Sequence, residues 1–296
     1  CSLFCAGTKT RSPLSTAEAS AEPGSFPERE KMRGRIVDEN FGFAESGMTG
    51  HAGQAEPPFR SEEATKRYIL ECRGLVKSYG NMVALQGIDL RIEEGGIVGL
   101  LGPNGSGKST LIKLAMGMLQ PTVGEILVAE QRPSPATKSL TAYLPDVSFL
   151  PEWMTVEQVF RYIADFFPDF RRDRAEAMIS RLGVGLKQRF KALSKGNKEK
   201  VGLIVTMARE AKLYILDEPI AGVDPAARDF ILDIIFSQKP EGSTIILCTH
   251  LIADIEPVLT HAVFLSDGKV VLDRSVQEVH DEGKTLDGIF REVFRW

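Results

Sequence analysis

The stretch Leu100–Thr110, LLGPNGSGKST, follows an apolar run and decides the expected fold. Gly102, Gly107, Lys108 and Ser109 match the spacing G-x-x-x-x-G-K-[S/T], with an apolar strand before them and a helical pattern after them. Glycines let the backbone curl so that successive N–H groups point at phosphate oxygens, and the helix start adds about half a positive charge. The stretch therefore predicts a loop that binds phosphate groups.

Individual side chains of this loop have separate predicted roles. The Lys108 ammonium is expected to neutralise the β- and γ-phosphates of a nucleotide. The Ser109 hydroxyl is expected to contact Mg²⁺, a hard cation that takes oxygen ligands. The residues predicted to contact the nucleotide here are Gly102, Pro103, Asn104, Gly105, Ser106, Gly107, Lys108, Ser109 and Thr110.

A second motif, LYILDEP, covers residues 213–219. Four apolar residues of a buried strand carry Asp217 and Glu218 to its carboxyl end, where ligands bind in α/β proteins. Asp217 is predicted to hold Mg²⁺ through water. Glu218 is predicted to polarise an attacking water, since phosphoryl transfer depends on positioning and charge stabilisation more than on covalent chemistry.

The segments around these motifs predict an α/β core. Residues 68–102 alternate or run apolar over strand lengths, with turns that contain glycine. Residues 110–119 have helical spacing that stops before Pro121. Strands that alternate with helices indicate an α/β fold. Three later apolar runs, separated by helical patterns, are also predicted strands: 213–216, 244–249 and 262–272.

Local signals predict where several elements begin and end. Thr155 followed by Gln158 forms a capping box that opens a helix, and this helix is expected to end before Pro168. The next helix is expected to end at Gly183. The Asp-Gly pair at 267–268 predicts a hairpin turn.

Composition limits the classes of function. The chain has 296 residues, 43% of them hydrophobic, and a formal net charge of −4, so no overall positive field marks it as a nucleic-acid binder. No apolar run approaches the roughly 20 residues that cross a bilayer. Cys72 and Cys248 lie in apolar, strand-like segments, which predicts buried, reduced thiols and a reducing compartment, and no metal-ligand spacing of cysteines is present.

A change of composition near residue 65 divides the chain. Residues 1–65 are rich in Ser, Gly, Pro, Glu and Arg and cannot bury enough apolar surface to offset chain entropy, so they are expected to be disordered. The strand-like pattern begins at Tyr68. Residues 66–296 are therefore predicted to form one nucleotide-binding domain.

Over residues 68–296 the sequence resembles the ABC-type ATPases, with the motifs in that family's order. Tyr79 in KSYG matches the aromatic residue that stacks on adenine, LSKGN at 193–197 lies where the family has its signature sequence, and AGVDP at 221–225 matches its D-loop. His250 in CTHL matches the switch histidine. The resemblance implies that His250 contacts the γ-phosphate and the attacking water.

The resemblance also implies that the signature sequence of one subunit covers the phosphate loop of a second subunit. The residues expected to contact a nucleotide in this way are Ser194, Lys195, Gly196 and Asp224. Ser194 and Asp224 also fit a local interpretation as N-caps, with Pro225 at the first position of the second helix. A capped helix start is itself an anion site, so both interpretations hold together.

Three residues depart from the family's pattern. Asp146 stands where the family usually has Gln, Lys195 where it has Gly, and Asn197 where it has Gln. Asp146 can still offer oxygen to Mg²⁺ or its waters, but it loses the amide donor and adds negative charge near the phosphates. Two interpretations stay open: Asp146 and Lys195 compensate each other's charge across two subunits, or Lys195 points to solvent.

The fold implied by the resemblance is an α/β P-loop NTPase core of the ABC ATPase type, with a small N-terminal antiparallel β region and a helical subdomain over about 148–200. The implied protein is an ATP-binding and hydrolysing subunit, with ATP and Mg²⁺ as cofactors, of a bacterial exporter with a separate membrane permease. A second ATPase subunit, in a homodimer or heterodimer, completes its sites at the cytoplasmic face of the membrane. Most aromatics of 149–170 are expected in the helical core, with a few exposed ones forming a groove for the permease's coupling helix.

Two other classes of function stay open. One is a soluble ABC-type ATPase that acts on nucleic acid or ribosomes. The single nucleotide domain, the lack of a long coiled-coil insertion and the lack of a basic tract argue against it. The other is a nucleotide switch with weak hydrolysis, which Asp146 favours and which Asp217, Glu218 and His250 oppose.

Overall fold

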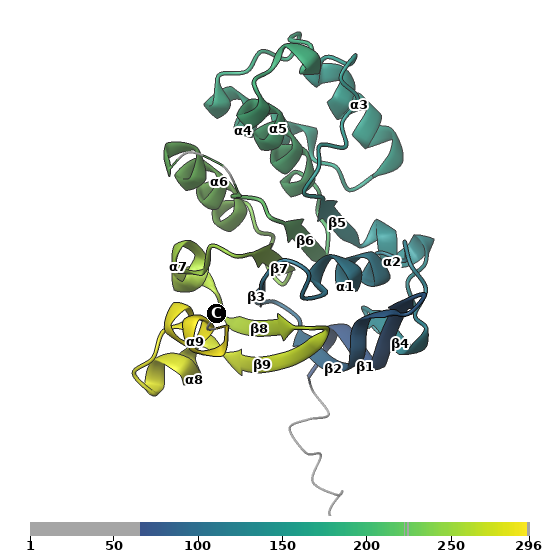
Figure 1. The fold of residues 1–296 in the computed structure, drawn as a ribbon. Coiled ribbons are helices and arrows are strands. Elements are labelled where there is room, and N and C mark those ends of the chain that lie inside the picture. The colour runs from purple at the N-terminus through teal and green to yellow at the C-terminus, as the bar shows by residue number, and fades with distance from the viewer. Residues whose placement is uncertain (1–65, 222, 224, 295–296) are drawn as a thin grey trace, which may run out of the picture. The chain divides into compact units, whose positions relative to one another are not determined.

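The computed structural model describes residues 66–221, 223 and 225–294, so the expected disorder of residues 1–65 and the expected role of Asp224 lie outside the described residues. Two sheets with helices packed against them make up the described part (Figure 1). The strands of the larger sheet are β3 (Ile97–Leu101), β5 (Thr141–Leu144), β6 (Leu213–Asp217), β7 (Thr244–Thr249), β8 (His261–Ser266) and β9 (Lys269–Ser275). Their order across the sheet is β5-β6-β7-β3-β8-β9.

All neighbours in this sheet run parallel except β8 and β9, which form a hairpin. Asp267 and Gly268 at its turn have φ of 46° and 74°, the left-handed values that a tight two-residue turn requires, so the predicted turn is confirmed. β6, β7 and β3 lie side by side in the middle of the sheet. The segments that follow these three strands therefore meet at one edge.

Helices cover both faces of the larger sheet (Figure 1). They are α1 (Lys108–Ala115), α2 (Pro135–Ser139), α3 (Val156–Phe166), α4 (Arg172–Leu182), α5 (Lys195–Met207), α6 (Pro225–Ser237), α7 (Ile252–Ile255), α8 (Val276–Asp281) and α9 (Leu286–Val293), with 3₁₀ turns η2 (Phe190–Ala192) and η3 (Glu256–Val258). None of the helices in the described part of the chain has the length and apolar character of a membrane span.

Capping signals located the ends of three helices. Thr155 and Gln158 form the predicted capping box at the start of α3. α4 ends before Gly183, which has φ of 69°, and Ser194 accepts a hydrogen bond from the Asn197 backbone at the start of α5. These predicted ends are confirmed. They could be predicted because each depends on side chains and backbone angles of residues close by in the sequence.

The end of α1 was predicted wrongly. The helical spacing of residues 110–119 predicted a helix through that range, but α1 ends at Ala115. Gly117 has φ of 61°, and its N–H donates to the Leu114 carbonyl. The apolar spacing runs on to residue 119, but the backbone at Gly117 is no longer helical, so the spacing alone predicted too long a helix.

A second, antiparallel sheet comprises β1 (Tyr68–Tyr79), β2 (Met82–Glu93) and β4 (Val123–Val128), in the order β2-β1-β4. The small N-terminal β region expected from the sequence is this sheet. β4 was not predicted, because its pattern is only six residues long and includes a glycine at its second position.

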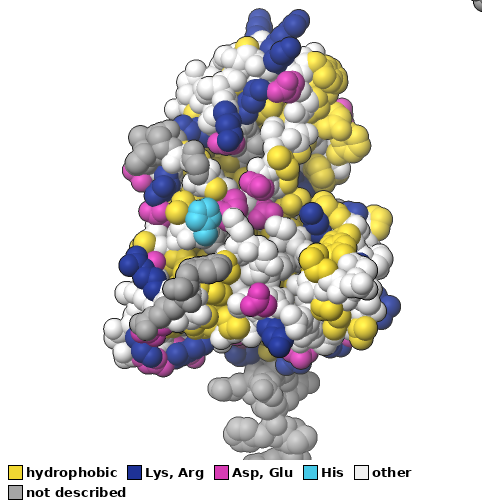
Figure 2. Space-filling view, in the orientation of Figure 1, with side chains coloured by type: hydrophobic (Ala, Val, Ile, Leu, Met, Phe, Trp, Pro, Cys, Tyr) yellow, Lys and Arg dark blue, Asp and Glu magenta, His cyan; other side chains and the backbone are white. Residues whose placement is uncertain are grey.

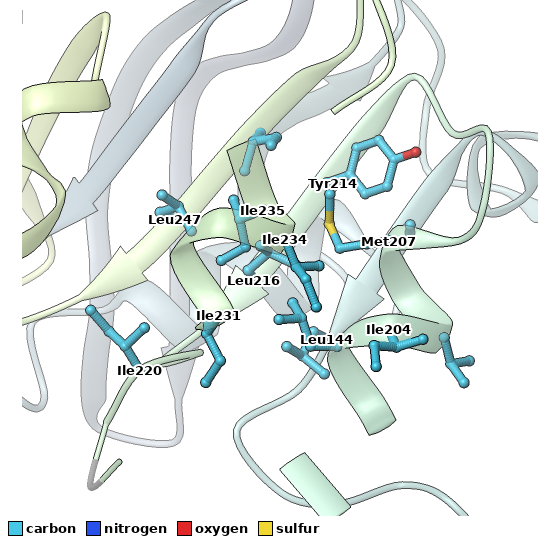
Figure 3. Packing of buried hydrophobic residues seen from close by; sticks show 14 of the residues in the cluster. Leu144, Ile204, Met207, Tyr214, Leu216, Ile220, Ile231, Ile234, Ile235 and Leu247 are labelled. Carbon is cyan, nitrogen blue, oxygen red and sulfur yellow. The ribbon is translucent and has the colours of Figure 1, made fainter. Parts of the chain in front are cut away.

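Alternate residues of the central strands face two different hydrophobic cores. In β6, Tyr214 and Leu216 face the first core, in which side chains of α5 and α6 lie against the sheet (Figure 3). Leu213 and Ile215 face the second core, which α1 and the small sheet complete. Cys248, predicted to be a buried thiol, is fully buried in the second core. A parallel sheet covered on both faces needs apolar residues at every position, which explains the unbroken apolar runs.

The aromatics of residues 149–170 do not mainly form a core, contrary to the prediction. Only Phe160 and Phe170 among them are buried. α3 buries one face only, so aromatics at its other positions point outward. The exposed aromatics are Phe149, Trp153, Tyr162 and Phe166.

Arg209 joins the helical segment to the strands. Its side chain is 5% exposed, and its Nε and Nη2 donate to the Asp169 carboxylate at 3.1 and 3.0 Å. The guanidinium also donates to the carbonyls of Thr141 and Ser139, at 2.6 Å each, and its carbon lies 3.8 Å from the Phe167 ring centroid. Every guanidinium nitrogen therefore has a partner.

Arg209→Met should lower the free energy of unfolding by about 3 kcal/mol, because it leaves the Asp169 carboxylate and two backbone carbonyls without donors. Urea denaturation followed by circular dichroism measures the change. Arg132→Met is the matched control, since that arginine is 81% exposed, and it should leave stability unchanged. Equal losses in the two variants would contradict the structural role of Arg209.

Candidate functional site

The loop between β3 and α1 closes around Lys108. The Lys108 side chain is buried, and its Nζ donates to the carbonyls of Gly102 (2.7 Å) and Pro103 (3.0 Å) at the other end of the loop. This arrangement places an ammonium group at the start of α1, where the helix dipole is also positive. Ser109, the next residue, is exposed.

Two glycines of the loop are required by space as well as by backbone angle. Gly102 has φ of 153°, and a Cβ there would lie 2.3 Å from the Leu265 carbonyl oxygen. Gly107 has φ of 111°, and a Cβ there would lie 2.9 Å from the Ala84 carbonyl oxygen. The loop therefore passes close to β8 on one side and β2 on the other, which no larger residue would permit.

Glu218 follows directly after β6 in a strained conformation. Its φ is 50°, and its N–H donates to the Cys248 carbonyl at 2.7 Å, near the end of β7. A residue other than glycine in this left-handed region costs of order 1 kcal/mol and persists only where its surroundings fix it. Such residues concentrate at functional sites.

Glu218 and His250 lie within hydrogen-bond distance. His250 Nδ1 is 3.1 Å from Glu218 Oε1. The Glu218 side chain is mostly buried, and its Oε2 has no hydrogen-bond partner among the described residues. One carboxylate oxygen is therefore held by the histidine, and the other is left to accept a hydrogen bond from a bound molecule.

Segments far apart in the sequence line one cavity of about 570 Å³. Its lining comes from the phosphate loop and the start of α1, the end of β6, the adjoining ends of β1 and β2, and the turn between β8 and β9. Gly102, Pro103 and Ser106 belong to the loop but do not line the cavity. The predicted site residues that do line it are Tyr79, Asn104, Gly105, Gly107, Lys108, Ser109, Thr110, Asp146, Asp217 and Glu218.

Met82 and Val83 also line this cavity and were not predicted. They are 63% and 47% exposed, beside Tyr79 at the start of β2. Together these three side chains give the cavity an apolar rim. The sequence does carry a signal for them. Two large apolar residues follow directly after the turn between β1 and β2, at the end of a strand, where no core is available to bury them.

The signature-like segment lies apart from this cavity. None of Ser194, Lys195 and Gly196 lines it. The Lys195 side chain is 91% exposed and lies 3.8 Å from Glu199 on the same helix. Lys195 lines a second cavity, of about 340 Å³, which shares Asp146, Asp217 and Glu218 with the first. Within one subunit the structure therefore does not bring the signature-like segment to the phosphate loop.

Three carboxylates of the first cavity repel one another. Burial raises the pKa of Asp217, and the charges of Asp146 and Glu218 raise it further, against the opposing effect of Lys108. Burial, with added repulsion from Asp217 and Asp146, also raises the pKa of the neighbouring Tyr143 to about 12. A cation at this place would relieve the repulsion.

The oxygen groups of the cavity fit Mg²⁺. Carboxylates and a hydroxyl are oxygen groups of the kind that this ion prefers, and Ser109, Asp146 and Asp217 line the same cavity. Among the described residues, no group of three or more His, Cys, Asp or Glu side chains is arranged to hold a metal ion unaided. The ion would take its other ligands from water and phosphate, as Mg²⁺ usually does.

Asp217→Asn should raise the melting temperature of the nucleotide-free protein by roughly 2–4 °C, equivalent to about 1 kcal/mol. Because the pKa of Asp217 is raised in the folded protein, ionisation favours the unfolded chain, and this cost develops as pH rises above the ordinary value of 3.8. Calorimetry near neutral pH measures the shift. Below pH 3.8 the variant and wild type should melt alike.

The exposed Asp165 provides the control, since Asp165→Asn should not change the melting temperature at either pH. An unchanged or lower melting temperature for Asp217→Asn near neutral pH would contradict the repulsion described above.

The family model described as ABC transporter matches residues 85–221, which include the phosphate loop, Asp217 and Glu218. The ABC transporter ATP-binding protein YtrB of Bacillus subtilis is 30% identical over 217 residues, covering 72% of this chain and 74% of the relative. The chain belongs to the ABC transporter ATP-binding proteins. The family predicted from the sequence is thereby confirmed.

Other members of this family resemble the chain over most of its described part. The lantibiotic transport ATP-binding protein SrtF of Streptococcus pyogenes is 28% identical over 75% of this chain and 96% of the relative. A solved ATP-binding subunit of an ABC transporter matches with a TM-score of 0.70 and 29% identity, over 77% of this chain and 100% of that one. The predicted fold class is confirmed by this match.

The chain spans only part of some relatives. It covers 59% and 62% of the length of uncharacterized ABC transporter ATP-binding proteins from Synechocystis and Nostoc, to which it is 30% and 31% identical.

Proposed function

We propose that this chain binds ATP with Mg²⁺, hydrolyses it, and drives a membrane permease formed by a separate chain, at the cytoplasmic face of the membrane. The observation that carries this proposal is the contact between Glu218 and His250, because Glu218 lines the same cavity as Lys108 and Ser109. A protein that only binds a nucleotide needs the phosphate loop but needs no positioned carboxylate beside it.

The chemistry proposed is the attack of water on the γ-phosphorus. The loop N–H groups and Lys108 hold the β- and γ-phosphates, with Lys108 exchanging its two carbonyl partners for phosphate oxygens. Glu218 Oε2 accepts a proton from the water as the new P–O bond forms and the bond to the ADP oxygen breaks. His250 holds Oε1 and so fixes which oxygen faces the water.

Other residues of the cavity support binding. Ser109, Asp217 and Asp146 would hold Mg²⁺, which neutralises phosphate charge when it is bound. Tyr79, with Met82 beside it, offers an apolar surface that suits the flat face of adenine.

A second ATPase subunit completes each site in this proposal. Ser194, Lys195 and Gly196 lie at the start of α5, outside the first cavity, and a helix start attracts anions. Two-fold pairing would place them over the phosphate loop of the other subunit, giving two sites. Asp224 is proposed to contribute to nucleotide binding as well. A homodimer and a heterodimer with a related ATPase both meet this requirement.

Export is the direction of transport that we propose. The relatives' names support this direction. Docking of a permease helix is supported by Val147 and Phe149, which are exposed and line the second cavity.

SrtF, one of the relatives, is named for lantibiotic transport. The SkfA peptide export ATP-binding protein SkfE of Bacillus subtilis is 26% identical over 77% of this chain and 98% of the relative.

Two measurements test the proposal. Wild-type protein with ATP and Mg²⁺ should release inorganic phosphate, and a protein that binds ATP without release would instead be a nucleotide switch. Glu218→Gln protein should be a monomer without nucleotide and a dimer with ATP by light scattering, because the γ-phosphate bridges two subunits. ADP is the control and should leave it a monomer. A monomer at high protein concentration with ATP would exclude the homodimer.

A further inference from the structure

A loop between α4 and α5 carries three cations that have no carboxylate partner. Lys187, Arg189 and Lys191 are all exposed, and no carboxylate in the described part of the chain lies within ion-pair distance of them. Backbone hydrogen bonds of 2.8–3.0 Å join residues 188–191 of this loop to residues 152–156. The loop is therefore held in place, and its charged side chains extend from a fixed backbone.

Trp153 belongs to the same surface. It is 70% exposed, more than any other described aromatic side chain. The carbonyls of its two neighbours, Glu152 and Met154, accept hydrogen bonds from the backbone N–H groups of Lys191 and Phe190. This register places Trp153 beside the cationic loop.

Glu152, whose backbone pairs with the loop, does not neutralise it. Glu152 Oε1 lies 2.6 Å from Lys198 Nζ. This hydrogen bond and the Lys198 charge lower the pKa of Glu152, and Lys191 adds a smaller effect. Glu152 is thus already paired, and Lys191 keeps its net attraction for other anions.

Positive charge continues around these residues. Between residues 187 and 200 the chain has six Lys or Arg and one Glu, although its net charge is −4. Figure 2 shows Lys and Arg side chains at the top of the view, over the end formed by α3, α4 and α5, with hydrophobic side chains along the adjoining edge. Basic side chains therefore gather at this end of the molecule.

We propose that Trp153, Lys187, Arg189 and Lys191 form a surface that binds the anionic headgroups of a lipid bilayer. Each basic side chain near an anionic bilayer strengthens binding about fivefold, and an amphipathic Trp ring prefers the headgroup level. The permease in the proposed function would bring this end to the membrane, but the lipid contact itself needs neither nucleotide nor permease.

Other anionic partners fit the surface less well. Proteins that bind single-stranded nucleic acid stack successive bases on several aromatic side chains along a groove. Here a single Trp lies beside the three cations, and none of the four residues lines either of the two cavities described above. A bilayer is a flat, extended anion and needs no groove.

The emission of Trp153 tests the proposal directly. The chain has two Trp residues, so Trp296→Phe leaves Trp153 as the sole source of Trp emission. Vesicles of phosphatidylcholine with phosphatidylglycerol should shift its emission to shorter wavelength as the ring leaves water. Vesicles of phosphatidylcholine alone should not, and added salt should weaken the effect.

Charge reversal gives the second measurement. Lys187→Glu, Arg189→Glu and Lys191→Glu together should weaken vesicle binding by roughly 100-fold or more. The matched control combines Lys138→Glu, Lys212→Glu and Lys269→Glu, at exposed lysines without ion pairs in the described structure, and should keep most of the binding. Circular dichroism and ATP affinity should match wild type in both triple variants. A change in vesicle binding alone therefore tests the lipid surface, and a change in ATP binding would concern the proposed nucleotide site.

Three results would overturn the proposal. The first is an emission that anionic vesicles leave unchanged. The second is equal weakening of vesicle binding by the two triple variants. The third is binding to polyuridylate or to polyglutamate without binding to vesicles, which would assign the surface to another class of partner.

Discussion

Glu218→Gln should reduce the turnover number for ATP hydrolysis by about 10³-fold, while the affinity for ATP stays within about twofold of wild type. The amide keeps the shape of the carboxylate and can still contact His250, which lies 3.1 Å from Glu218 Oε1. It cannot accept a proton from water. Phosphate release and equilibrium binding of ATP, measured separately, distinguish a loss of chemistry from a loss of binding.

The control for this variant is Glu241→Gln, at an exposed glutamate. It should hydrolyse ATP at the wild-type rate. Wild-type turnover by Glu218→Gln would show that Glu218 is not the base. A loss of ATP affinity in that variant would show that the carboxylate contributes to binding instead.

Lys108→Ala should lower the affinity for ATP by about 100-fold, since two charge-assisted hydrogen bonds contribute about 3 kcal/mol. The variant removes the ammonium group that faces the cavity. It also leaves the carbonyls of Gly102 and Pro103 without their donor, so the loop is no longer held closed. Isothermal titration calorimetry with ATP measures the change.

Lys113→Ala is the matched control, because Lys113 lies on the same helix and is exposed. Its affinity for ATP should remain near that of wild type. If Lys108→Ala bound ATP as tightly as Lys113→Ala, the loop would not be the phosphate site.

The features that could be predicted from the sequence are those encoded within a few neighbouring residues. The phosphate loop, the capping box at Thr155 and the turn at 267–268 each depend on local backbone geometry. The apolar run before Asp217 predicted a buried central strand, because a strand covered on both faces has no polar positions. The roles assigned to the loop and to Asp217 remain predictions.

Contacts between distant segments could not be predicted in the same way. The sequence gives no geometric reason for Glu218 and His250, 32 residues apart, to lie within hydrogen-bond distance. The partners of Arg209 come from segments 40 to 70 residues away. The exposure of Trp153 also depends on packing, because composition alone does not distinguish an aromatic in a core from one on a surface.

The central position of β3 has a consequence for biosynthesis. β3 pairs with β7 and β8, so Ile97 meets its partner Ile245 about 150 residues later in the chain. At 5–20 residues per second, roughly 7–30 s of translation separate the two strands. Until β7 leaves the ribosome, the strand that leads into the phosphate loop has neither neighbour. Truncated nascent chains that end before residue 244 should therefore fail to bind nucleotide. Binding should first be detected when both β7 and β8 have emerged from the ribosome.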